Sequence, residues 1–361
     1  MRLGEEKRDC RQFQGHIPCK PHKKEGVECP NCPYYDPVKE RILIIKLGAR
    51  GDVIRTTPLL HKFKTEYPNS EITWLTHTPE FVPRKWVDRI MTFNLPNIVT
   101  LQAENFDLLI NLDKDPEACA LANIVAAKTK KGYWLHDGKP SPIDNDAVHK
   151  YMTGIDDTQN KTNTKNYIEE IFEICGYSWK GEEYILEMPP SKLHLPAFGK
   201  PVIGLSTGVG VRWKTRLWSV AHWIDLARKL QENGYSVLLL GGADEHEQNL
   251  VIAEHSGATY LGHYSLNDFV HLVNACDIVV TAVTMTMHIA IALKKKLLLF
   301  VNIFPQVEFE LYGLGKIIEP GVPCQGCFKN TCDIRFDGKT CMELITPQQV
   351  LQSILELGKN Q

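Results

Sequence analysis

The stretch RILIIKLGARGDVIRTTPLL, residues 41–60, contains the first side chains whose types and spacing suggest chemistry. Its pattern predicts a buried strand and then a helix, with two glycines and Asp52 at the junction. The glycines allow the backbone to approach a ligand closely, and a helix N-terminus favours an ionised carboxylate. Such a carboxylate, flanked by Arg50 and Arg55, can accept the proton of an attacking hydroxyl. The plainer interpretation is that Asp52 only caps the helix.

Two common nucleotide-binding motifs are absent from this junction. KLGARGD lacks the G-x-G-x-x-G spacing, and no acidic residue ends the next predicted strand, EITWLTH, so we do not expect a nicotinamide dinucleotide. The G-x-x-x-x-G-K-[ST] pattern of a P-loop is missing as well. The net charge is −2, so no overall basic field favours nucleic acid as a partner.

A second group of side chains follows a later predicted strand. STGVGVRWKTRLW, residues 206–218, is a Gly-rich loop that carries Arg212, Lys214 and Arg216, which suits an anion. The alternative is a solvated basic loop. His288 lies a few residues beyond another strand end, where a ligand contact and a packing role are about equally expected.

Two polar segments in the first half could face a second substrate. NLDKDPEA places Asp113 and Lys114 at a strand end, although an ordinary polar loop explains them equally well. NKTNTKNY, residues 160–167, is polar enough to contact a polar substrate, or it only caps the following helix.

Eight of the eleven cysteines gather in two clusters near the chain ends. Each cluster contains a C-x-x-C pair and two more cysteines, so each can supply four thiolates to a tetrahedral metal. Zinc, iron or an iron–sulfur cluster suits such ligands, and a structural role is expected. Two sites, one site joining the termini, and free thiols remain alternatives. The clusters are Cys10, Cys19, Cys29 and Cys32, and Cys324, Cys327, Cys332 and Cys341.

Alternating strands and helices must position these residues. With 361 residues and 43% hydrophobic side chains, the chain can bury two cores. The alternation predicts parallel sheets. The expected strands are RILIIKL, EITWLTH, RIMTFN, DLLINL, PVIGLSTG, YSVLLLGG, DIVVTAV and LLLFVNI. The expected helices are DVIRTTPLLHKFKTEYP, PEACALANIVAAKT, TNTKNYIEEIFEICGYSW, SVAHWIDLARKLQENG, SLNDFVHLVNAC, TMTMHIAIALKKK and TPQQVLQSILELG.

Three regions are expected along the chain. Residues 1–40 form a Cys-rich appendage, residues 41–190 an N-terminal domain, and residues 191–361 a C-terminal domain. Two parallel α/β domains can turn the carboxyl ends of their strands toward one cleft. That arrangement suits an enzyme that joins two substrates.

No segment approaches the roughly 18 uninterrupted apolar residues of a membrane span, and the N-terminus has no apolar signal region. We therefore expect a cytoplasmic protein that contacts the inner membrane only peripherally, if at all.

ILIIKLGARGDVIRTTPLL resembles the N-terminal signature of glycosyltransferase family 9, which contains the lipopolysaccharide heptosyltransferases. RLWSVAHWIDLARKLQENGYSVLLLGGADEHE, YSLNDFVHLVNACDIVVTAVTMTMHIAIALKK and CMELITPQQV resemble further segments of the family, in order. The resemblance covers about residues 41–361 and is clearest at Gly51-Asp52, Arg216–Trp218 and Thr284–His288. The Cys-rich appendage resembles that of a subset of members from anaerobic bacteria.

The resemblance implies a GT-B fold, with two Rossmann-like parallel-sheet domains facing a cleft, and inverting transfer from a nucleotide-sugar. The residue matching Asp52 is the family's proposed base. The residue matching Arg216 contacts the donor phosphates, and the helix that begins near Thr284 faces them. No divalent metal is implied at the reaction centre, because helix N-termini and basic side chains hold the diphosphate. The expected donor residues are Thr207, Gly208, Lys214, Arg216, Thr284, Met285, Thr286, Met287 and His288, and the expected acceptor residues are Arg50, Gly51, Arg55, Asp113 and Lys114.

Two departures from the family pattern lie on the donor side. The family usually has an Asp before the residue matching Thr284, and this chain has Val283, which cannot hydrogen-bond a sugar hydroxyl. The family's Gly and polar loop after LLLF are replaced by residues 301–304, VNIF.

We expect an inverting glycosyltransferase that moves a sugar, such as heptose from ADP-heptose, onto a lipopolysaccharide or other surface glycan. The alternatives are a catalytically silent binding protein, suggested by Val283, and a nucleotide-sugar epimerase on the same fold.

Overall fold

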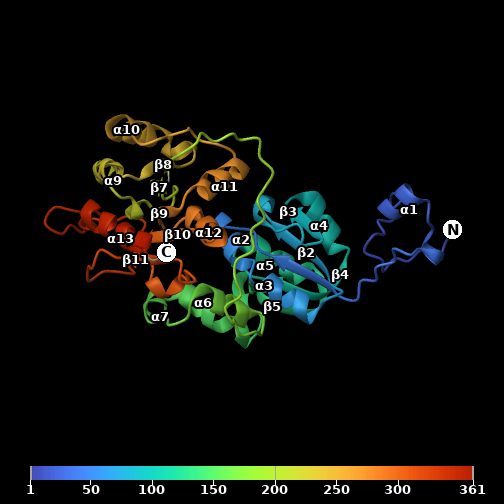
Figure 1. Cartoon of the computed structure of the whole chain (residues 1–361). Helices are drawn as coiled ribbons and strands as arrows, with labels where there is room; N and C mark the ends of the chain where they lie inside the picture. The colour runs from blue at the N-terminus through green and yellow to red at the C-terminus, as the bar shows by residue number, and fades with distance from the viewer. Residues whose placement is uncertain (1, 200, 360–361) are drawn as a thin grey trace. The chain divides into compact units, whose positions relative to one another are not determined.

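The structure is a computed structural model that describes residues 2–199 and 201–359 (Figure 1). The chain divides into two compact units. The first unit comprises the chain up to Leu47 and Leu59–Ala147, and the second comprises Gly48–Pro58 and the chain from Val148 onward. The sequence assigns residues 148–190 to the N-terminal domain, whereas in the structure they pack with the second unit. The predicted domain boundaries at residues 40 and 190 stay a prediction.

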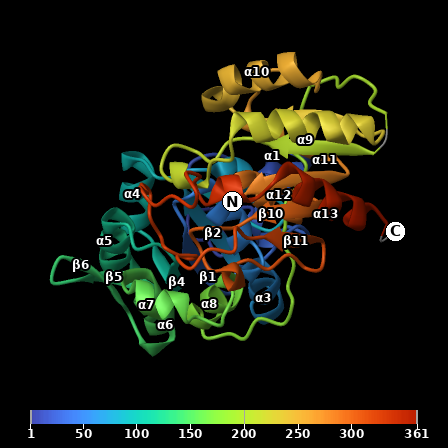
Figure 2. The ribbon, with the colours of Figure 1, turned by 90° about the vertical axis from the view of Figure 1, so that its left-hand side faces the viewer.

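The first unit contains a six-stranded sheet in the order β3-β2-β1-β4-β5-β6. All neighbouring strands pair in parallel except β5 and β6, which form an antiparallel hairpin at the edge (Figure 2). The central strand β1 is a run of branched apolar residues that is buried on both sides, as parallel sheets require. The strands are β1 (Arg41–Ile45), β2 (Glu71–Thr76), β3 (Arg89–Thr92), β4 (Asn105–Asn111), β5 (Ala126–His136) and β6 (Lys139–Pro142).

Helices α3, α4 and α5 accompany this sheet (Figure 1). Leu101 and Leu121 from these helices pack with Leu43 and Leu109 of the strands in one apolar cluster. The α-helices and 3₁₀ helices of this unit are α1 (Lys20–Glu25), η1 (Cys29–Asn31), α3 (Leu59–Glu66), η2 (Pro79–Phe81), α4 (Leu95–Gln102), α5 (Pro116–Ile124) and η3 (Asn145–Ala147).

The second unit contains a five-stranded sheet in the order β11-β10-β9-β7-β8, and every pair is parallel. The order reverses beside β7, which makes a switch point where open α/β sheets bind ligands at the carboxyl ends of the strands. The strands are β7 (Val202–Ser206), β8 (Ser236–Leu240), β9 (Ile278–Ala282), β10 (Lys296–Phe300) and β11 (Gly315–Ile318).

Helices cover both faces of the second sheet. Helices α9 and α13 pack together on one face, and α11 and α12 lie on the other (Figure 1). Ser219 caps the N-terminus of α9 and Ser265 that of α11, because each hydroxyl accepts a backbone N–H of the first turn. The helices are α2 (Arg50–Thr56), α6 (Val148–Ile155), α7 (Asp157–Lys161), α8 (Tyr167–Ile174), η4 (Lys214–Arg216), α9 (Val220–Glu232), η5 (Ala243–Glu245), α10 (His246–Ser256), α11 (Leu266–Ala275), α12 (Met285–Ala292), η6 (Gln306–Glu308), η7 (Met342–Leu344) and α13 (Pro347–Lys359).

Two predicted helices differ from the structure. The helix predicted from Asp52 onward is divided into α2 and α3, because Pro58 has no N–H to continue the hydrogen-bond ladder. The helix predicted over PEACALANIVAAKT ends at Ile124, and its last residues already belong to β5. The structure also has elements that the sequence does not predict, namely α1, α4, α6, α7, α10, β5, β6 and β11.

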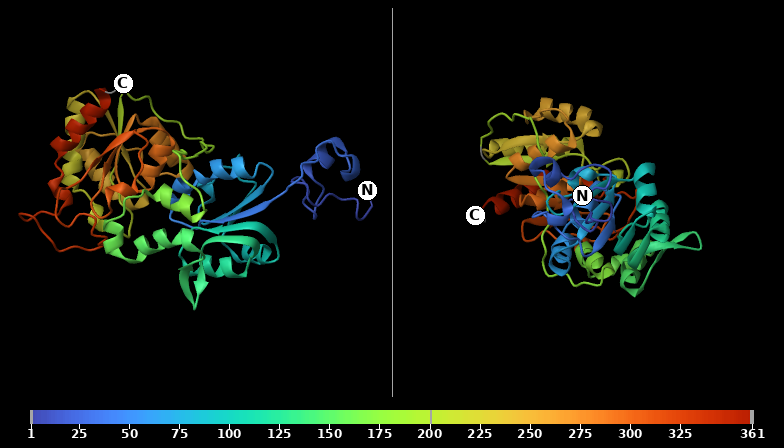
Figure 3. Two further views of the ribbon diagram at one scale, coloured as in Figure 1. Left: turned by 90° about the horizontal axis from the view of Figure 1, so that it is seen from below. Right: turned by 90° about the vertical axis from the view of Figure 1, so that its right-hand side faces the viewer.

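The appendage, residues 2–40, is mostly coil apart from α1 and η1 (Figure 3). None of its residues is buried in this structure. Arg11 ties it to the first sheet, since its guanidinium donates to the Ser70 carbonyl at 3.0 Å and pairs with Asp88 at 2.5 Å.

Candidate functional site

A cavity of about 960 Å³ lies in the second unit, at the carboxyl ends of its strands. Ser206 and Gly241, which end or follow β7 and β8, line it together with the start of α12. The N-terminal turn of α2 closes another side. The cavity therefore brings together the Gly-Asp junction and the Gly-rich basic loop, which lie more than 150 residues apart in the sequence.

Gly51 determines how closely α2 approaches α12. A Cβ at Gly51 would lie 2.4 Å from Cδ2 of His288, which is closer than any real carbon contact. The sequence pattern suggests a glycine that admits a ligand, and in this structure it admits the His288 ring instead.

Asp52 both caps α2 and faces the cavity. Its Oδ2 accepts the Ala49 N–H at 3.2 Å, and its Oδ1 lies 2.8 Å from Nη2 of Arg55. The side chain is 28% exposed. The capping role weighed in the sequence is therefore real, and it leaves the carboxylate accessible to a ligand.

Arg55 is the buried partner of two carboxylates. Its Nη1 lies 3.1 Å from Oε1 of Glu308, and its guanidinium lies 3.2 Å from the ring centroid of Tyr167. Burial disfavours the charged form, but the negative charges of Asp52 and Glu308 outweigh it and raise the pKa of Arg55. Arg55 therefore stays positive.

Arg216 is a buried cation of a different kind. It is 6% exposed, and its guanidinium donates to the carbonyls of Val209 at 2.7 Å, Trp213 at 3.3 Å and Val283. Burial lowers the pKa of Arg216 to about 10, and no carboxylate in the described part of the chain opposes this effect. A positive charge that lines a cavity without a counter-charge is suited to an anionic ligand.

The start of α12 provides a hydrogen-bonding edge to the same cavity. Thr284 is its N-cap and accepts the Thr286 N–H at 3.2 Å, and the Thr286 hydroxyl lies 3.0 Å from that of Ser206. His288 is buried, and burial together with the nearby Arg55 charge lowers the pKa of its imidazole to about 3. The ring is therefore neutral, and its Nδ1 lies 3.3 Å from the Tyr184 hydroxyl.

Most of the predicted donor residues line this cavity, but three do not. Thr207 is buried and donates to Oδ1 of Asn249 at 2.6 Å, and Met287 packs in the core. Lys214 lines a separate cavity. The predicted donor residues that do line the cavity are Gly208, Arg216, Thr284, Met285, Thr286 and His288.

The predicted acceptor residues fall into two groups. Arg50, Gly51 and Arg55 line the cavity of the second unit. Asp113 belongs to the first unit and is 4% exposed. Its carboxylate pairs with the Lys46 ammonium and accepts the backbone N–H of Leu47. Burial raises the pKa of Asp113 despite that partner. Its contacts with Lys46 and Leu47 join the chain just after β1 to the chain just after β4.

Lys114 also belongs to the first unit. Its Nζ lies 5.8 Å from the centroid of the Tyr133 ring. Lys114 and Asp113 stay a prediction as acceptor residues.

Sequence reasoning missed several residues of the cavity. Glu308 and Tyr184 come from irregular segments without a motif, and only the tertiary fold brings them to α2 and α12. Glu245 also lines the cavity. A Cβ at Gly208 would lie 2.1 Å from Oε1 of Glu245 and one at Gly241 would lie 2.8 Å from its Cβ, so both glycines leave room for this side chain. An aromatic wall is formed by Trp213 and Phe304, whose ring centroids lie 5.8 Å apart.

The two cysteine clusters lie around two other cavities. The N-terminal four line one of about 20 Å³, and the C-terminal four line one of about 420 Å³ together with Lys214. Over residues 2–199 and 201–359, no group of three or more His, Cys, Asp or Glu side chains is placed to hold a metal ion. The structure therefore does not show the predicted metal sites.

Within the same described ranges, no helix is both long and apolar enough to cross a membrane. This agrees with the absence of a long apolar run in the sequence.

Two parallel α/β units with a ligand cavity at the strand ends define a GT-B-like protein, which confirms the predicted fold class. The chain belongs to glycosyltransferase family 9 (heptosyltransferase), whose model matches residues 98–333. This confirms the resemblance to the family, whereas the likeness of the Cys-rich appendage to a subset of members stays a prediction.

Individual relatives agree with this assignment. Lipopolysaccharide heptosyltransferase 2 of Escherichia coli (strain K12) is 32% identical over 105 residues, which is 27% of this chain and 30% of that protein. The chain therefore matches less than a third of the length of the curated relatives.

Solved structures resemble the fold over nearly its whole length. The glycosyl transferase family 9 structure from Veillonella parvula DSM 2008 has a TM-score of 0.65 at 16% identity and covers 89% of this chain and 97% of its own. E. coli heptosyltransferase WaaC with ADP-2-deoxy-2-fluoro heptose has a TM-score of 0.58 at 19% identity and covers 88% and 99%.

Proposed function

We propose that this protein is an inverting glycosyltransferase that uses a nucleoside diphosphate sugar as donor, with ADP-heptose as the first candidate. The observation that carries the proposal is the buried charge of Arg216, which lines the same cavity as Asp52 and has no carboxylate partner among residues 2–199 and 201–359. An anionic diphosphate would supply the missing counter-charge. A structural relative has been solved with an ADP-heptose analogue, which supports this choice of donor.

The proposed reaction uses the residues around this cavity. The carboxylate of Asp52 accepts the proton of an acceptor hydroxyl while the oxygen attacks the anomeric carbon of the sugar. The bond from that carbon to the diphosphate breaks on the opposite face, so the configuration inverts. Arg216 and the N-terminus of α12 stabilise the negative charge on the leaving diphosphate. The acceptor is proposed to be a lipopolysaccharide or another surface glycan, reached by peripheral contact with the inner membrane.

The first test is calorimetric titration of the full chain with ADP-heptose, ADP, UDP and GDP. Selective binding of one nucleotide would support a transferase and would identify its base. Absence of binding to all four would favour the silent binding protein suggested by Val283, whose side chain lines the cavity without a polar group.

Asp52→Asn tests the proposed base. The amide retains an oxygen for the Ala49 N–H, so α2 stays capped while the proton acceptor is lost. Transfer should fall by about 100-fold or more, with donor affinity nearly unchanged. Asp225→Asn is the matched control, since that carboxylate pairs with Lys229 on the surface of α9. Equal turnover in the two variants would contradict the assignment, and donor turnover without an acceptor would indicate the epimerase.

The cysteine clusters are a separate proposal, and no step of the reaction passes through them. Zinc or iron would suit four thiolates, but the thiols of this structure do not form a ligand set, so binding requires their side chains to reorient. Metal analysis of the purified protein, with Cys29→Ser and Cys324→Ser as separate variants, would show whether either cluster binds an ion.

A further inference from the structure

Arg55 joins two carboxylates from distant parts of the chain. Its Nη2 lies 2.8 Å from Asp52 on its own helix, and its Nη1 lies 3.1 Å from Glu308 in η6. All three residues line the same cavity. The two anions therefore share one guanidinium at the place where the proposed base acts.

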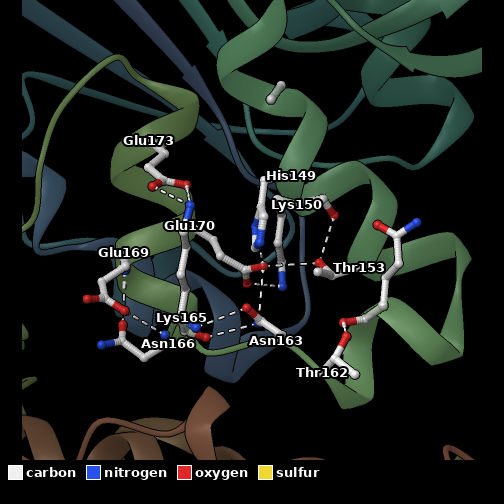
Figure 4. Close-up of polar contacts among 12 residues, drawn as sticks. His149, Lys150, Thr153, Thr162, Asn163, Lys165, Asn166, Glu169, Glu170 and Glu173 are labelled. Carbon is white, nitrogen blue, oxygen red and sulfur yellow. Dashed lines mark hydrogen bonds and ion pairs between the residues drawn. The ribbon is translucent and has the colours of Figure 1, made fainter.

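The Tyr167 ring fixes the plane of that guanidinium. The ring is 7% exposed at the start of α8, and its centroid lies 3.2 Å from Cζ of Arg55. A guanidinium over an aromatic face is attracted to it. The Lys150 ammonium lies 4.7 Å from the centroid of the same ring. Its Nζ also donates to the Glu170 carboxylate at 2.6 Å (Figure 4). Arg55 consequently has little freedom to follow one carboxylate if the other is lost.

Glu308 affects Asp52 through the positive charge of Arg55, with which both carboxylates form an ion pair. The side chains of Glu308 and Asp52 are 17% and 28% exposed, so their interactions with Arg55 are only partly screened. Without Glu308 the full charge of Arg55 would act on Asp52 alone, which stabilises the carboxylate and makes it a weaker proton acceptor.

We propose that Glu308 is a positioning residue, which binds one side of the Arg55 guanidinium and thereby leaves Asp52 oriented and able to accept the proton of the acceptor hydroxyl. This inference rests on the proposed function. Arg55 transmits the effect of Glu308 to Asp52, because its guanidinium pairs with both carboxylates. Tyr167 takes part as well, because its ring keeps the Arg55 guanidinium between the two carboxylates.

The groups that face Asp52 make its pH profile interpretable. They are Arg55 on α2, His288 on α12, Tyr184, and Glu308 through Arg55. Burial lowers the pKa of His288 to about 3 and raises the pKa of Tyr184 above its usual range, and Arg55 stays charged. None of these three groups titrates near neutral pH.

The experiment measures kcat and KM of the full chain against pH, with the donor and acceptor on which the wild type shows transfer. Glu308→Gln keeps an oxygen for Arg55 and removes the charge. Its kcat should fall by about tenfold, with donor KM within about twofold and the acidic limb of kcat/KM moved to lower pH. Glu173→Gln, which removes a carboxylate paired with Lys165 outside the cavity, should match the wild type.

Two substitutions at Tyr167 test whether its aromatic ring is needed to position Arg55. Tyr167→Phe keeps the aromatic face and should retain the wild-type kcat, whereas Tyr167→Leu should lose activity to about the same degree as Glu308→Gln. A thermal midpoint close to that of the wild type would show that the Glu308 variant folds normally, and Glu308→Asp provides a second, charged variant that should recover part of the rate.

Each other outcome has a definite meaning. An unchanged kcat and pH profile in Glu308→Gln would overturn the inference while leaving the proposed function intact. A loss as large as that of Asp52→Asn would make Glu308 itself the proton acceptor and would also overturn it. Absence of transfer by the wild type on any donor and acceptor tested would instead count against the proposed function.

Discussion

Gly51 shows that the site depends on a missing side chain. Replacement by Ala would put a methyl group 2.4 Å from the buried His288 ring, so α2 and α12 would have to separate. Overpacking of this kind usually destabilises a protein by about 1–3 kcal/mol. We expect Gly51→Ala to lower the free energy of unfolding by that amount, measured as a lower denaturant midpoint in urea unfolding. Gly48→Ala is the control, since no atom lies within 4 Å of its Cβ position, and equal stability of the two variants would contradict the packing described here.

His288 should make stability depend on pH. The unfolded imidazole gains its proton near pH 6.5, whereas burial and the Arg55 charge lower the pKa of the folded imidazole to about 3. Between these values the unfolded state binds more protons, so the free energy of unfolding falls as the pH is lowered from about 6.5 toward 3.

Thermal melts of the wild type and His288→Gln across that range would measure this contribution. The variant should lose less stability on acidification, because its amide does not titrate. If the stability of the two proteins depended on pH in the same way, the pKa of His288 would not be lowered in the folded state.

Sequence reasoning could find the site residues that lie in local motifs and missed those that lie outside them. Asp52 and Arg216 follow strands in glycine-containing junctions, where physical chemistry and family resemblance agree. Glu308 and Tyr184 lie in segments without periodicity, so only the tertiary fold reveals their partners. Thr207 and Lys214 belong to the predicted loop, but their neighbours direct one into the core and the other toward a different cavity.

At the scale of elements, the segment before α8 shows how a polar loop can serve the core. Asn166 accepts the N–H groups of Ile168 and Glu169, and the Glu169 carboxylate accepts the Asn166 N–H in return. The helix-capping interpretation of this segment is thus supported by its geometry. Its next turn places Glu170 fully inside, where Lys150 and the Thr153 hydroxyl satisfy it at 2.6 and 3.0 Å (Figure 4).

Glu170→Gln should destabilise the packing of α6 against α8. The carboxylate is 0% exposed and pairs with Lys150, and breaking a buried ion pair by removing one charge typically destabilises a protein by about 3 kcal/mol. Urea unfolding would measure the change. Glu173 lies one turn later on the same helix, where it pairs with Lys165, and both side chains are more than a third exposed. Glu173→Gln should therefore change stability by less than about 0.5 kcal/mol. A Glu170 variant as stable as this control would contradict the buried pair.

The same elements show what periodicity can and cannot predict. Runs such as RILII and SVLLL are short, branched and buried, so strands β1 and β8 were predictable from pattern alone. β5 was not, because its AAKTKKGYWLH sequence places lysines on an edge and continues the preceding helix pattern without a Gly or Pro break. The short helices α6 and α7 lie in a polar stretch whose order depends on contacts such as Lys150–Glu170.

At the scale of the whole molecule, the division into units places the Gly-Asp junction with the second sheet. The chain passes from the first unit to the second after Leu47, returns after Pro58, and passes again at Val148. The residues that line the large cavity all belong to the second unit. A ligand that fills this cavity should therefore stabilise the second unit and the inserted α2 together.

Hydrogen exchange with and without the nucleotide identified by calorimetry would test this. A ligand that binds only the folded unit adds about 2.7 kcal/mol at 100 times its dissociation constant, so protection should rise in Gly48–Pro58 and from Val148 onward. Exchange in the strands of the first unit should stay unchanged, and a nucleotide that does not bind in the titration is the control. Protection of Leu59–Ala147 to the same degree would contradict the assignment of the cavity to the second unit. Unchanged exchange in α2 would instead show that Asp52 does not belong to the nucleotide-binding cavity in solution.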